Sequence, residues 1–197
     1  MLKVTAVILA GGQSSRMGHD KGLMELQGKP LINHVAQALQ KTDELLVNSE
    51  NLEYAALGFT LIEDLNTPDV PAQSGPLLGV FSGLKQAEND WVLFSPCDTP
   101  LIPNDYATRM SQFASDRLTK ACVAYDGDRQ QNLHVLLHKS LADSLQMYLL
   151  SGRRKTYEWL ASVAVDRVDF SAEAKLFRNI NTPMDLQLLS NELSTKQ

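Results

Sequence analysis

The sequence predicts an α/β domain built around a mostly parallel sheet, and three observations support this. Short apolar runs alternate with segments whose apolar residues recur at helical spacing, as in strand–helix–strand units. A glycine pair and a polar loop directly follow the first apolar run, as in phosphate-binding loops. Two later runs flank the turn Asp126-Gly127-Asp128, which predicts an antiparallel hairpin and therefore a mixed sheet.

The first half of the chain carries the clearest alternation. Its expected strands are apolar or rich in β-branched residues and end at polar or turn residues. Between them, apolar residues recur at helical spacing, as in Leu31, Val35 and Leu39. Parallel strands need such helical crossovers, so the pattern predicts a mostly parallel arrangement. The expected strands are residues 4–10, 45–49, 60–63 and 91–95, and the expected helices are residues 31–40 and 77–88.

The second half predicts the hairpin together with several helices. We expect the last helix to begin at Thr182, with Thr182 as its cap, Pro183 in the first position and Asp185 in the first turn. The expected strands are residues 120–125 and 133–137, and the other expected helices are residues 103–115, 140–150 and 156–161.

Composition limits the classes of function. At 197 residues the chain is long enough to bury a substantial core, and we expect residues 1–197 to form a single domain. A net charge of −5 argues against a nucleic-acid-binding surface, which would need a basic face. The sequence shows neither a signal peptide nor a run of about 20 apolar residues that could span a membrane. Cys97 and Cys122 form no disulfide framework or metal motif, so a reducing cytoplasm fits best.

Residues 9–21, with the sequence LAGGQSSRMGHDK, are the most informative segment. Gly11 and Gly12 lack Cβ atoms, so their backbone N–H groups can approach an anion closely. Arg16 and Lys21 then supply positive charge where phosphate charge accumulates. The combination indicates a nucleoside-triphosphate site, and a flexible surface turn is the alternative.

The spacing excludes two better-known phosphate-binding motifs. A P-loop ends in Gly-Lys-Ser/Thr, whereas Gly28 and Lys29 are followed by Pro30, which offers magnesium no hydroxyl. A dinucleotide-binding fingerprint needs Gly-x-Gly-x-x-Gly, but Gly11 and Gly12 are adjacent.

Asp98 directly follows the expected strand 91–95, in the short sequence PCDTP. The two prolines restrict the backbone and hold the carboxylate at the mouth of the sheet. A single carboxylate facing a phosphate-binding loop suits Mg²⁺, which binds one or two carboxylates together with waters and substrate phosphates. The alternative role is to cap the helix that begins near Pro103, although Thr99 or Asn104 could do this equally well.

Polar residues also follow other expected elements. Asn48 and Asp64 lie at the ends of two strands, so they are candidates for contacts to a base or ribose, with loop or capping roles as the alternative. Asn179 and Asn181 alternate onto one side of an extended segment before the last helix, where they can hold substrate oxygens or a water on a metal ion. Turn and capping chemistry is again the alternative.

Residues 66–75 are rich in Pro, Asn, Ser and Gly, and Pro76 then opens a helix. A helix N-terminus presents free N–H groups and the positive end of the helix dipole. The segment is therefore either a wall of a nucleotide pocket, whose backbone reads a base edge, or a long crossover loop.

Other chemical signals do not assemble into a site. The four histidines form no metal cluster, and His134 and His138, on an expected strand and its exit, need not converge. Ser14 and Ser15 lack an assignable base, so no Ser-His-Asp set can be argued. Arg153 opens a cationic run that is either a solvated helix start or a contact to an anionic second substrate.

Together the motifs resemble the molybdenum cofactor guanylyltransferases, the MobA family. The first motif is LAGG-x-S-x-RMG-x-DK at residues 9–21, and it differs from the Leu-Ala-Ala-Gly and longer gap of related nucleotidyltransferases. The others are GKPL at residues 28–31, GPL-x-G at residues 75–79, CDTP at residues 97–100 and N-x-NTP at residues 179–183. The resemblance spans nearly the whole chain, with one departure at Asn132, where relatives often have proline.

The resemblance implies a Rossmann-like, GT-A-like nucleotidyltransferase fold, a three-layer α/β/α sandwich with a mostly parallel mixed sheet. It also implies Mg²⁺-dependent transfer of GMP from GTP to molybdopterin, which releases pyrophosphate and forms the molybdopterin guanine dinucleotide cofactor. A related enzyme that uses CTP or makes a nucleotide sugar is the nearest alternative. A non-catalytic GTP-binding partner that delivers the cofactor is another.

Residue roles follow from the matching motifs. The expected catalytic residues are Arg16, Lys21 and Asp98, and Asp98 is also the expected metal ligand. The expected GTP-binding residues are Leu9, Ala10, Gly11, Gly12, Lys21, Asn48, Asp64, Gly79 and Asp98. The expected second-substrate residues are Asn179, Asn181 and Arg153. We expect a cytoplasmic monomer with GTP and molybdopterin as partners, molybdoenzyme maturation proteins as further candidates, and no nucleic acid or membrane.

Overall fold

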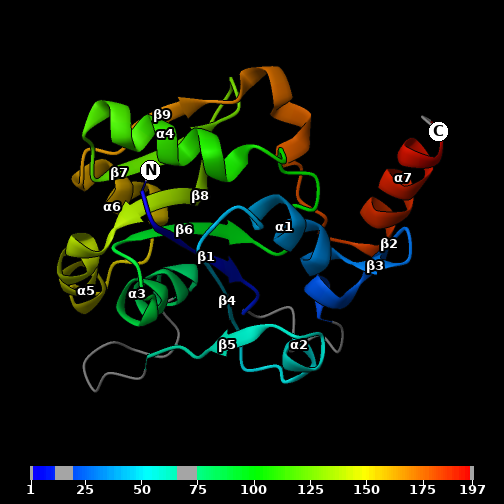
Figure 1. Ribbon diagram of the computed structural model, residues 1–197, viewed down its shortest axis with the longest axis horizontal. Coiled ribbons are helices and arrows are strands. Elements are labelled where there is room, and N and C mark those ends of the chain that lie inside the picture. The colour runs from blue at the N-terminus through cyan, green and yellow to red at the C-terminus, as the bar shows by residue number, and fades with distance from the viewer. Residues whose placement is uncertain (1, 12–19, 66–74, 196–197) are drawn as a thin grey trace.

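Seven strands form one sheet in the order β5-β4-β1-β6-β8-β7-β9 (Figure 1). The computed structural model describes residues 2–11, 20–65 and 75–195. Only β8 runs against its neighbours: it pairs antiparallel with β6 and β7, while the other neighbouring strands pair in parallel. The expected mixed sheet with a hairpin is therefore confirmed. The strands are β1 (Val4–Leu9), β4 (Glu44–Asn48), β5 (Thr60–Ile62), β6 (Trp91–Pro96), β7 (Ala121–Tyr125), β8 (Gln130–His138) and β9 (Asp166–Asp169).

Helices connect these strands and cover both faces of the sheet (Figure 1). Within the described residues, none of them is long and apolar enough to cross a bilayer. The helices are α1 (Leu31–Leu39), α2 (Glu53–Ala56), α3 (Pro76–Gln86), α4 (Tyr106–Arg117), α5 (Ala142–Leu150), α6 (Thr156–Ser162) and α7 (Pro183–Ser194).

The central strand β1 explains the layering. All six of its residues are buried, because both of its faces are covered. Val4, Ala6 and Ile8 contribute to the core beneath α1 and α4, whereas Val7 and Leu9 contribute to the core beneath α3, α5 and α6. The alternation follows from the two-residue period of a strand. It produces the expected three-layer α/β/α sandwich.

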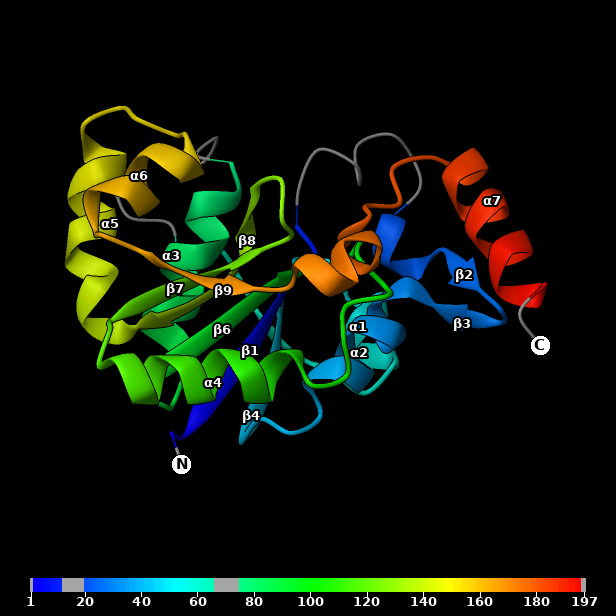
Figure 2. The same ribbon diagram turned by 90° about the horizontal axis from the view of Figure 1, so that it is seen from above.

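A small accessory unit lies at one end of the molecule, opposite α5 and α6 (Figure 2). It consists of α7 and the two-stranded pair β2 (Glu25–Leu26) and β3 (Lys29–Pro30). Leu26, Leu31, Ile180 and Leu189 form its core. As expected, α7 begins with a capping box, in which the side chains of Thr182 and Asp185 each accept from the other's backbone N–H.

Several boundaries differ from the sequence prediction, and β9 was not predicted at all. The segment DRVD of β9 has only Val168 buried, because the strand lies at the sheet edge, so it shows no apolar run. Helix α4 begins three residues later than expected, since Pro103 accepts from the Tyr106 N–H in a turn before the helix. β8 begins at Gln130 rather than at residue 133, and residues 139–141 form a 3-10 turn ahead of α5.

Close packing of α3 on the sheet gives the first testable prediction. A Cβ atom at Gly83 would lie 2.6 Å from Cε1 of Phe94 and 3.2 Å from Cγ2 of Val7, both fully buried. Gly83→Ala should therefore destabilise the protein by about 1–3 kcal/mol through overpacking, despite a gain of about 1 kcal/mol in helix propensity. Urea unfolding measures this, with Lys85→Ala on the same helix as a control that should change stability by less than about 0.5 kcal/mol. An unchanged or raised stability in Gly83→Ala would contradict the packing.

Candidate active site

The carboxyl end of β1 brings three candidate segments to one edge of the sheet. Leu9 lies opposite Asn48 of β4 on one side and Pro96 of β6 on the other. The hydrogen bonds continue past the strand end, from Ala10 N–H to the Asn48 carbonyl and from Cys97 N–H to the Leu9 carbonyl, both at 3.1 Å. Ligands of such sheets bind outside the carboxyl ends of the strands. This edge is therefore where a substrate is expected.

Lys21 and Asp98 meet at this edge, 3.9 Å apart between Nζ and Oδ2. Each charge also has an amide partner from the segment that precedes α7. Lys21 Nζ donates to Asn181 Oδ1 at 2.8 Å, and Asn179 Nδ2 donates to Asp98 Oδ1 at 3.3 Å. Between these amides, the Ile180 N–H donates to the Asp98 carbonyl at 2.8 Å. The structure thus brings together four of the predicted site residues.

The Asp98 carboxylate is largely enclosed, with 16% of its side chain exposed. Burial raises its pKa, while Lys21 and the Asn179 amide act in the opposite direction. It does not cap α4, whose N-cap residue is Asp105, so the capping alternative is wrong. A capping role was also the alternative for Asn179 and Asn181. It is wrong for their side chains, since the side chains of Thr182 and Asp185 cap α7.

Asn48 and Asp64 form a second polar unit at the same edge. Asn48 Nδ2 donates to Asp64 Oδ1 at 3.1 Å, and Asn48 is buried. Burial raises the pKa of Asp64, and the hydrogen bond from Asn48 lowers it. The unit depends on Gly79 in the first turn of α3, because a Cβ atom there would overlap the Asn48 Oδ1 atom. The three predicted residues therefore lie together.

Asp20 holds the backbone next to Lys21. Its carboxylate caps the 3-10 turn that begins at Lys21, accepting from Gly22 N–H at 3.1 Å. It also accepts from Asn51 Nδ2 at 3.1 Å and from the hydroxyl of Tyr54, a buried residue of α2. Gly22 must be small, since a Cβ atom there would overlap that hydroxyl. The sequence indicated Asp20 only as part of the motif; its structural partners could not be read from it.

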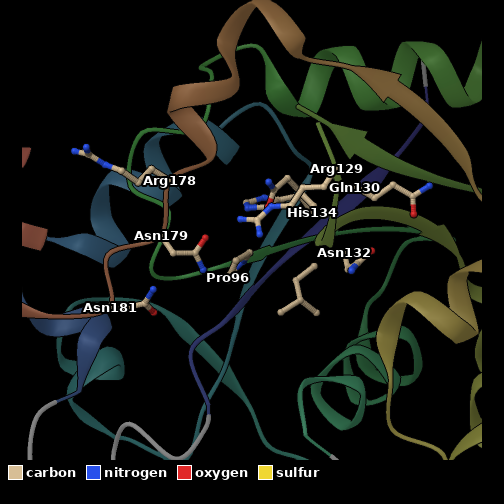
Figure 3. Close-up of a pocket in the computed structure, with 10 residues that line it drawn as sticks. Pro96, Arg129, Gln130, Asn132, His134, Arg178, Asn179 and Asn181 are labelled. Atoms are coloured by element: carbon tan, nitrogen blue, oxygen red, sulfur yellow. The ribbon is translucent and has the colours of Figure 1, made fainter. Parts of the chain in front are cut away.

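A cavity of about 530 Å³ is lined in part by Asn179 and Asn181 (Figure 3). Because these two amides contact Asp98 and Lys21, the cavity adjoins that pair. Its walls come from the end of β6, the start of β8 and the segment before α7. Amide side chains dominate the lining, and each can both donate and accept hydrogen bonds. Arg129 and Arg178 add positive charge. The lining residues are Pro96, Arg129, Gln130, Gln131, Asn132, Leu133, His134, Arg178, Asn179 and Asn181.

The hairpin turn before β8 is held in shape by Asp126. Its carboxylate accepts from the backbone N–H groups of Asp128 and Arg129 at 2.9 and 2.8 Å, and from Gln131 Nε2 at 2.5 Å. Arg129 remains 72% exposed, with its Nε 4.0 Å from Asp126. The turn therefore presents a cation beside the cavity.

The remaining predicted residues have different placements. Leu9 and Ala10 are buried at the strand end, and Gly11 is exposed beyond it. Gly12 and Arg16 lie outside the described residues, as does most of the predicted pocket wall at residues 66–75. Arg153 lies between α5 and α6, with its guanidinium over the Tyr148 ring at 5.6 Å, and it is not among the described residues that line the cavity.

Sequence reasoning missed several cavity residues. Arg129 and Arg178 carried no motif signal, and His134 was set aside because it formed no cluster with the other histidines. The one usable signal was the polar sequence QQN ahead of an apolar strand, at Gln130, Gln131 and Asn132. Such a polar start of a strand is also typical of an exposed hairpin, so it does not identify a site by itself.

Comparison with known proteins gives the family. Residues 6–168 match the MobA-like NTP transferase domain. The chain is 41% identical over 189 residues to the molybdenum cofactor guanylyltransferase of Yersinia pseudotuberculosis serotype O:1b (strain IP 31758), covering 94% of each chain. The protein of the same name from Yersinia pestis (strain Pestoides F) matches at the same identity and coverage.

Solved structures share the fold. Molybdopterin-guanine dinucleotide biosynthesis protein A from Archaeoglobus fulgidus superposes with a TM-score of 0.75 at 24% identity, covering 98% of this chain and 100% of that one. The 2-C-methyl-D-erythritol 4-phosphate cytidylyltransferase of Thermus thermophilus gives 0.69 at 15% identity, with coverages of 99% and 100%. On the domain match and the identity to the curated relatives, the chain belongs to the MobA-like NTP transferase family.

Proposed function

We propose that this protein transfers GMP from GTP to molybdopterin, releasing pyrophosphate and forming the molybdopterin guanine dinucleotide cofactor. One observation carries the proposal: a cation and a carboxylate, Lys21 and Asp98, meet 3.9 Å apart at the ligand-binding edge of the sheet, beside an amide-lined cavity. Relatives that are 41% identical over 94% of the chain are named molybdenum cofactor guanylyltransferases, which supports the same activity here.

On the donor side, Lys21 is suited to neutralise the charge that develops on the departing pyrophosphate. Arg16, in the same loop, is proposed to share this role. The Asn48–Asp64 unit offers an amide and a carboxylate to the ribose or base. The absence of a side chain at Gly79 leaves room for the Asn48 amide beside α3. Gly11 is exposed just after β1, the strand between β4, which carries Asn48, and β6, which leads to Asp98. Its backbone N–H can approach a phosphate closely because glycine has no side chain.

Magnesium dependence is part of the proposal. Among the described residues, no three His, Cys, Asp or Glu side chains cluster as a metal site. A single carboxylate such as Asp98, with substrate phosphates and waters as the other ligands, does fit the coordination that Mg²⁺ prefers. When bound, Mg²⁺ would supply charge stabilisation to the phosphate oxygens. Asp98 would hold it in its ionised form; burial raises the pKa of the carboxyl and opposes that form, while Lys21 and the Asn179 amide favour it.

The cavity is proposed to hold the pterin of the acceptor. A pterin edge carries both hydrogen-bond donors and acceptors, and the amides of Asn132, Asn179 and Asn181 offer both in return. Asn179 and Asn181 also contact Asp98 and Lys21, so the cavity and the phosphate-binding pair share residues. An acceptor in the cavity would therefore have its phosphate directed toward that pair.

The reaction needs no protein nucleophile. An oxygen of the acceptor's terminal phosphate attacks the α-phosphorus of GTP, and the bond from that phosphorus to the bridging oxygen of pyrophosphate breaks. A phosphate monoester is already largely anionic near neutral pH, so no general base is required. The chain contributes positioning and charge, which is the usual division of work in phosphoryl transfer.

The donor nucleotide distinguishes this proposal from its nearest alternatives. We expect purified protein with molybdopterin to release pyrophosphate with GTP, and to do so far more slowly with CTP or ATP. Mass spectrometry of the product should give the guanine dinucleotide. A preference for CTP would favour a cytidylyltransferase, and GTP binding without pyrophosphate release would favour a non-catalytic carrier.

Substitution of Asp98 tests the proposed catalytic pair. Asp98→Asn keeps the shape of the side chain but removes its charge, so the turnover rate should fall by about 10²–10³-fold. Lys21→Ala should cause a comparable loss, since the pyrophosphate then leaves without its partner charge. Circular dichroism should show both variants folded. Near wild-type turnover in either variant would remove that residue from the mechanism.

Gly79 tests the nucleotide side. Gly79→Ala should displace the Asn48 amide and weaken GTP binding by roughly tenfold, about 1.4 kcal/mol, as measured by isothermal titration calorimetry. Gly83→Ala, the same change one turn later on α3, is the matched control and should leave GTP affinity unchanged. In an Asn48→Ala background, Gly79→Ala should have no further effect on affinity. An equal loss in that background would show that Gly79 does not act through Asn48.

Arg129 tests the acceptor side. Because its side chain is 72% exposed, Arg129→Ala should leave stability unchanged. We expect it to raise the KM for molybdopterin severalfold and to leave the KM for GTP as in wild type, while Arg129→Lys should retain part of the affinity. A rise in the KM for GTP instead would place the acceptor elsewhere.

A further inference from the structure

His134 of β8 is a buried polar residue that the mechanism above does not use. Only 2% of the residue is exposed, and both ring nitrogens have partners. Nδ1 lies 3.3 Å from the Ser95 hydroxyl oxygen, and Nε2 lies 3.2 Å from the Thr99 hydroxyl oxygen. Ser95 and Thr99 are fully buried and stand on either side of the turn that carries Asp98. One ring therefore connects both ends of that turn.

The hydrogen bonds have a defined direction. Both hydroxyls also lie near the Pro96 carbonyl, Thr99 at 3.2 Å and Ser95 at 3.5 Å. The shorter contact assigns the Thr99 proton to that carbonyl, so Thr99 accepts from the Nε2–H of His134. Nδ1 is then the acceptor and the Ser95 hydroxyl its donor. Burial lowers the pKa of His134 to about 3, in agreement with a neutral ring that uses one nitrogen as donor and one as acceptor.

Packing prevents the ring from turning. Tyr106 and Phe177 meet it edge to face, with ring centroids at 5.7 and 5.1 Å and interplanar angles of 89° and 86°. The Tyr106 hydroxyl in turn donates to the Phe94 carbonyl of β6 at 3.1 Å. The ring is thereby fixed relative to the strand that leads to Asp98. His134 also lines the cavity (Figure 3), and within the described residues its ring nitrogens bond to Ser95 and Thr99 rather than to Lys21 or Asp98.

We propose that His134 is a positioning residue for Asp98: by bridging Ser95 and Thr99 it fixes the turn from which the carboxylate projects. The opposite side of the turn is held by the segment before α7, through Ile180 and Asn179. Asp98 is thus clamped between β8 and that segment. The inference rests on the proposed function, because it gives the alignment of Asp98 a catalytic consequence.

A buried histidine can equally be a core residue whose loss only destabilises the fold. A double-mutant cycle separates the two roles. His134→Phe keeps an aromatic ring against Tyr106 and Phe177 but removes both hydrogen bonds. We expect it to lower kcat by at least about tenfold, since small displacements of catalytic groups are costly. In an Asp98→Asn background, the same change should lower kcat by less than about twofold, because the group it positions is already disabled.

Stability provides the contrast. Loss of the two hydrogen bonds should lower the urea midpoint equally in both backgrounds, so stability effects should add while kcat effects should not. His134→Gln restores a donor and an acceptor and should recover part of kcat. If His134→Phe folds poorly, His134→Gln replaces it as the test variant in the cycle. The matched control is His138→Phe on the same strand, a partly buried residue that packs on Trp91 outside the site, which should leave kcat within about twofold of wild type.

A second measurement does not depend on turnover. Mn²⁺ binding to the protein with a non-hydrolysable GTP analogue can be titrated by electron paramagnetic resonance without acceptor. His134→Phe and Asp98→Asn should each weaken Mn²⁺ binding severalfold, and the double variant no further. Wild-type Mn²⁺ affinity in His134→Phe, or equal kcat losses in both backgrounds, would overturn the inference. A wild-type protein without transfer activity would contradict the proposed function instead, and the Mn²⁺ titration would still decide the placement of Asp98.

Discussion

The arrangement of Lys21 and Asp98 is the constraint around which the rest of the site is organised. Two partly buried opposite charges usually close to a short ion pair, which would leave neither free for a ligand. Here Lys21 donates to the Asn181 amide oxygen at 2.8 Å, the Asn179 amide donates to Asp98 at 3.3 Å, and the charged atoms stay 3.9 Å apart. The charges are thereby compensated without being closed off from a phosphate or a metal ion.

The fold supplies this arrangement by bringing four distant segments to one edge. Parallel pairing of β1 with β4 and β6 places Gly11, Asn48 and the Asp98 turn at adjacent strand ends. The segment before α7 then returns across that edge, anchored by the Ile180–Asp98 backbone bond and by the capping box of α7. The start of the antiparallel strand β8 forms the last wall of the cavity. The cavity therefore lies where the strand direction in the sheet reverses, between β6 and β8.

Much of this could be predicted from the sequence, and the physical reason differs from part to part. Strands buried on both faces appear as apolar runs, and ligand residues lie at their ends, so the sheet and Asp98 were predictable. The pairing of Lys21 with Asn181 joins residues 160 positions apart, and no local pattern encodes it. The cavity was likewise beyond reach, because Arg129 and Arg178 come together only in the folded chain. His134 was set aside because it forms no cluster with the other histidines, and its partners, the hydroxyls of Ser95 and Thr99, belong to no motif that a sequence would reveal.

The central claim is that the N-terminal loop and the Asp98 turn bind one triphosphate between them. A crystal structure with a non-hydrolysable GTP analogue and Mg²⁺ tests this most directly. We predict phosphate oxygens within hydrogen-bond distance of Lys21 Nζ and a metal ion bridging them to the Asp98 carboxylate. A triphosphate bound away from this edge, or one that contacts Lys21 while Asp98 stays paired only with protein groups, would contradict the account.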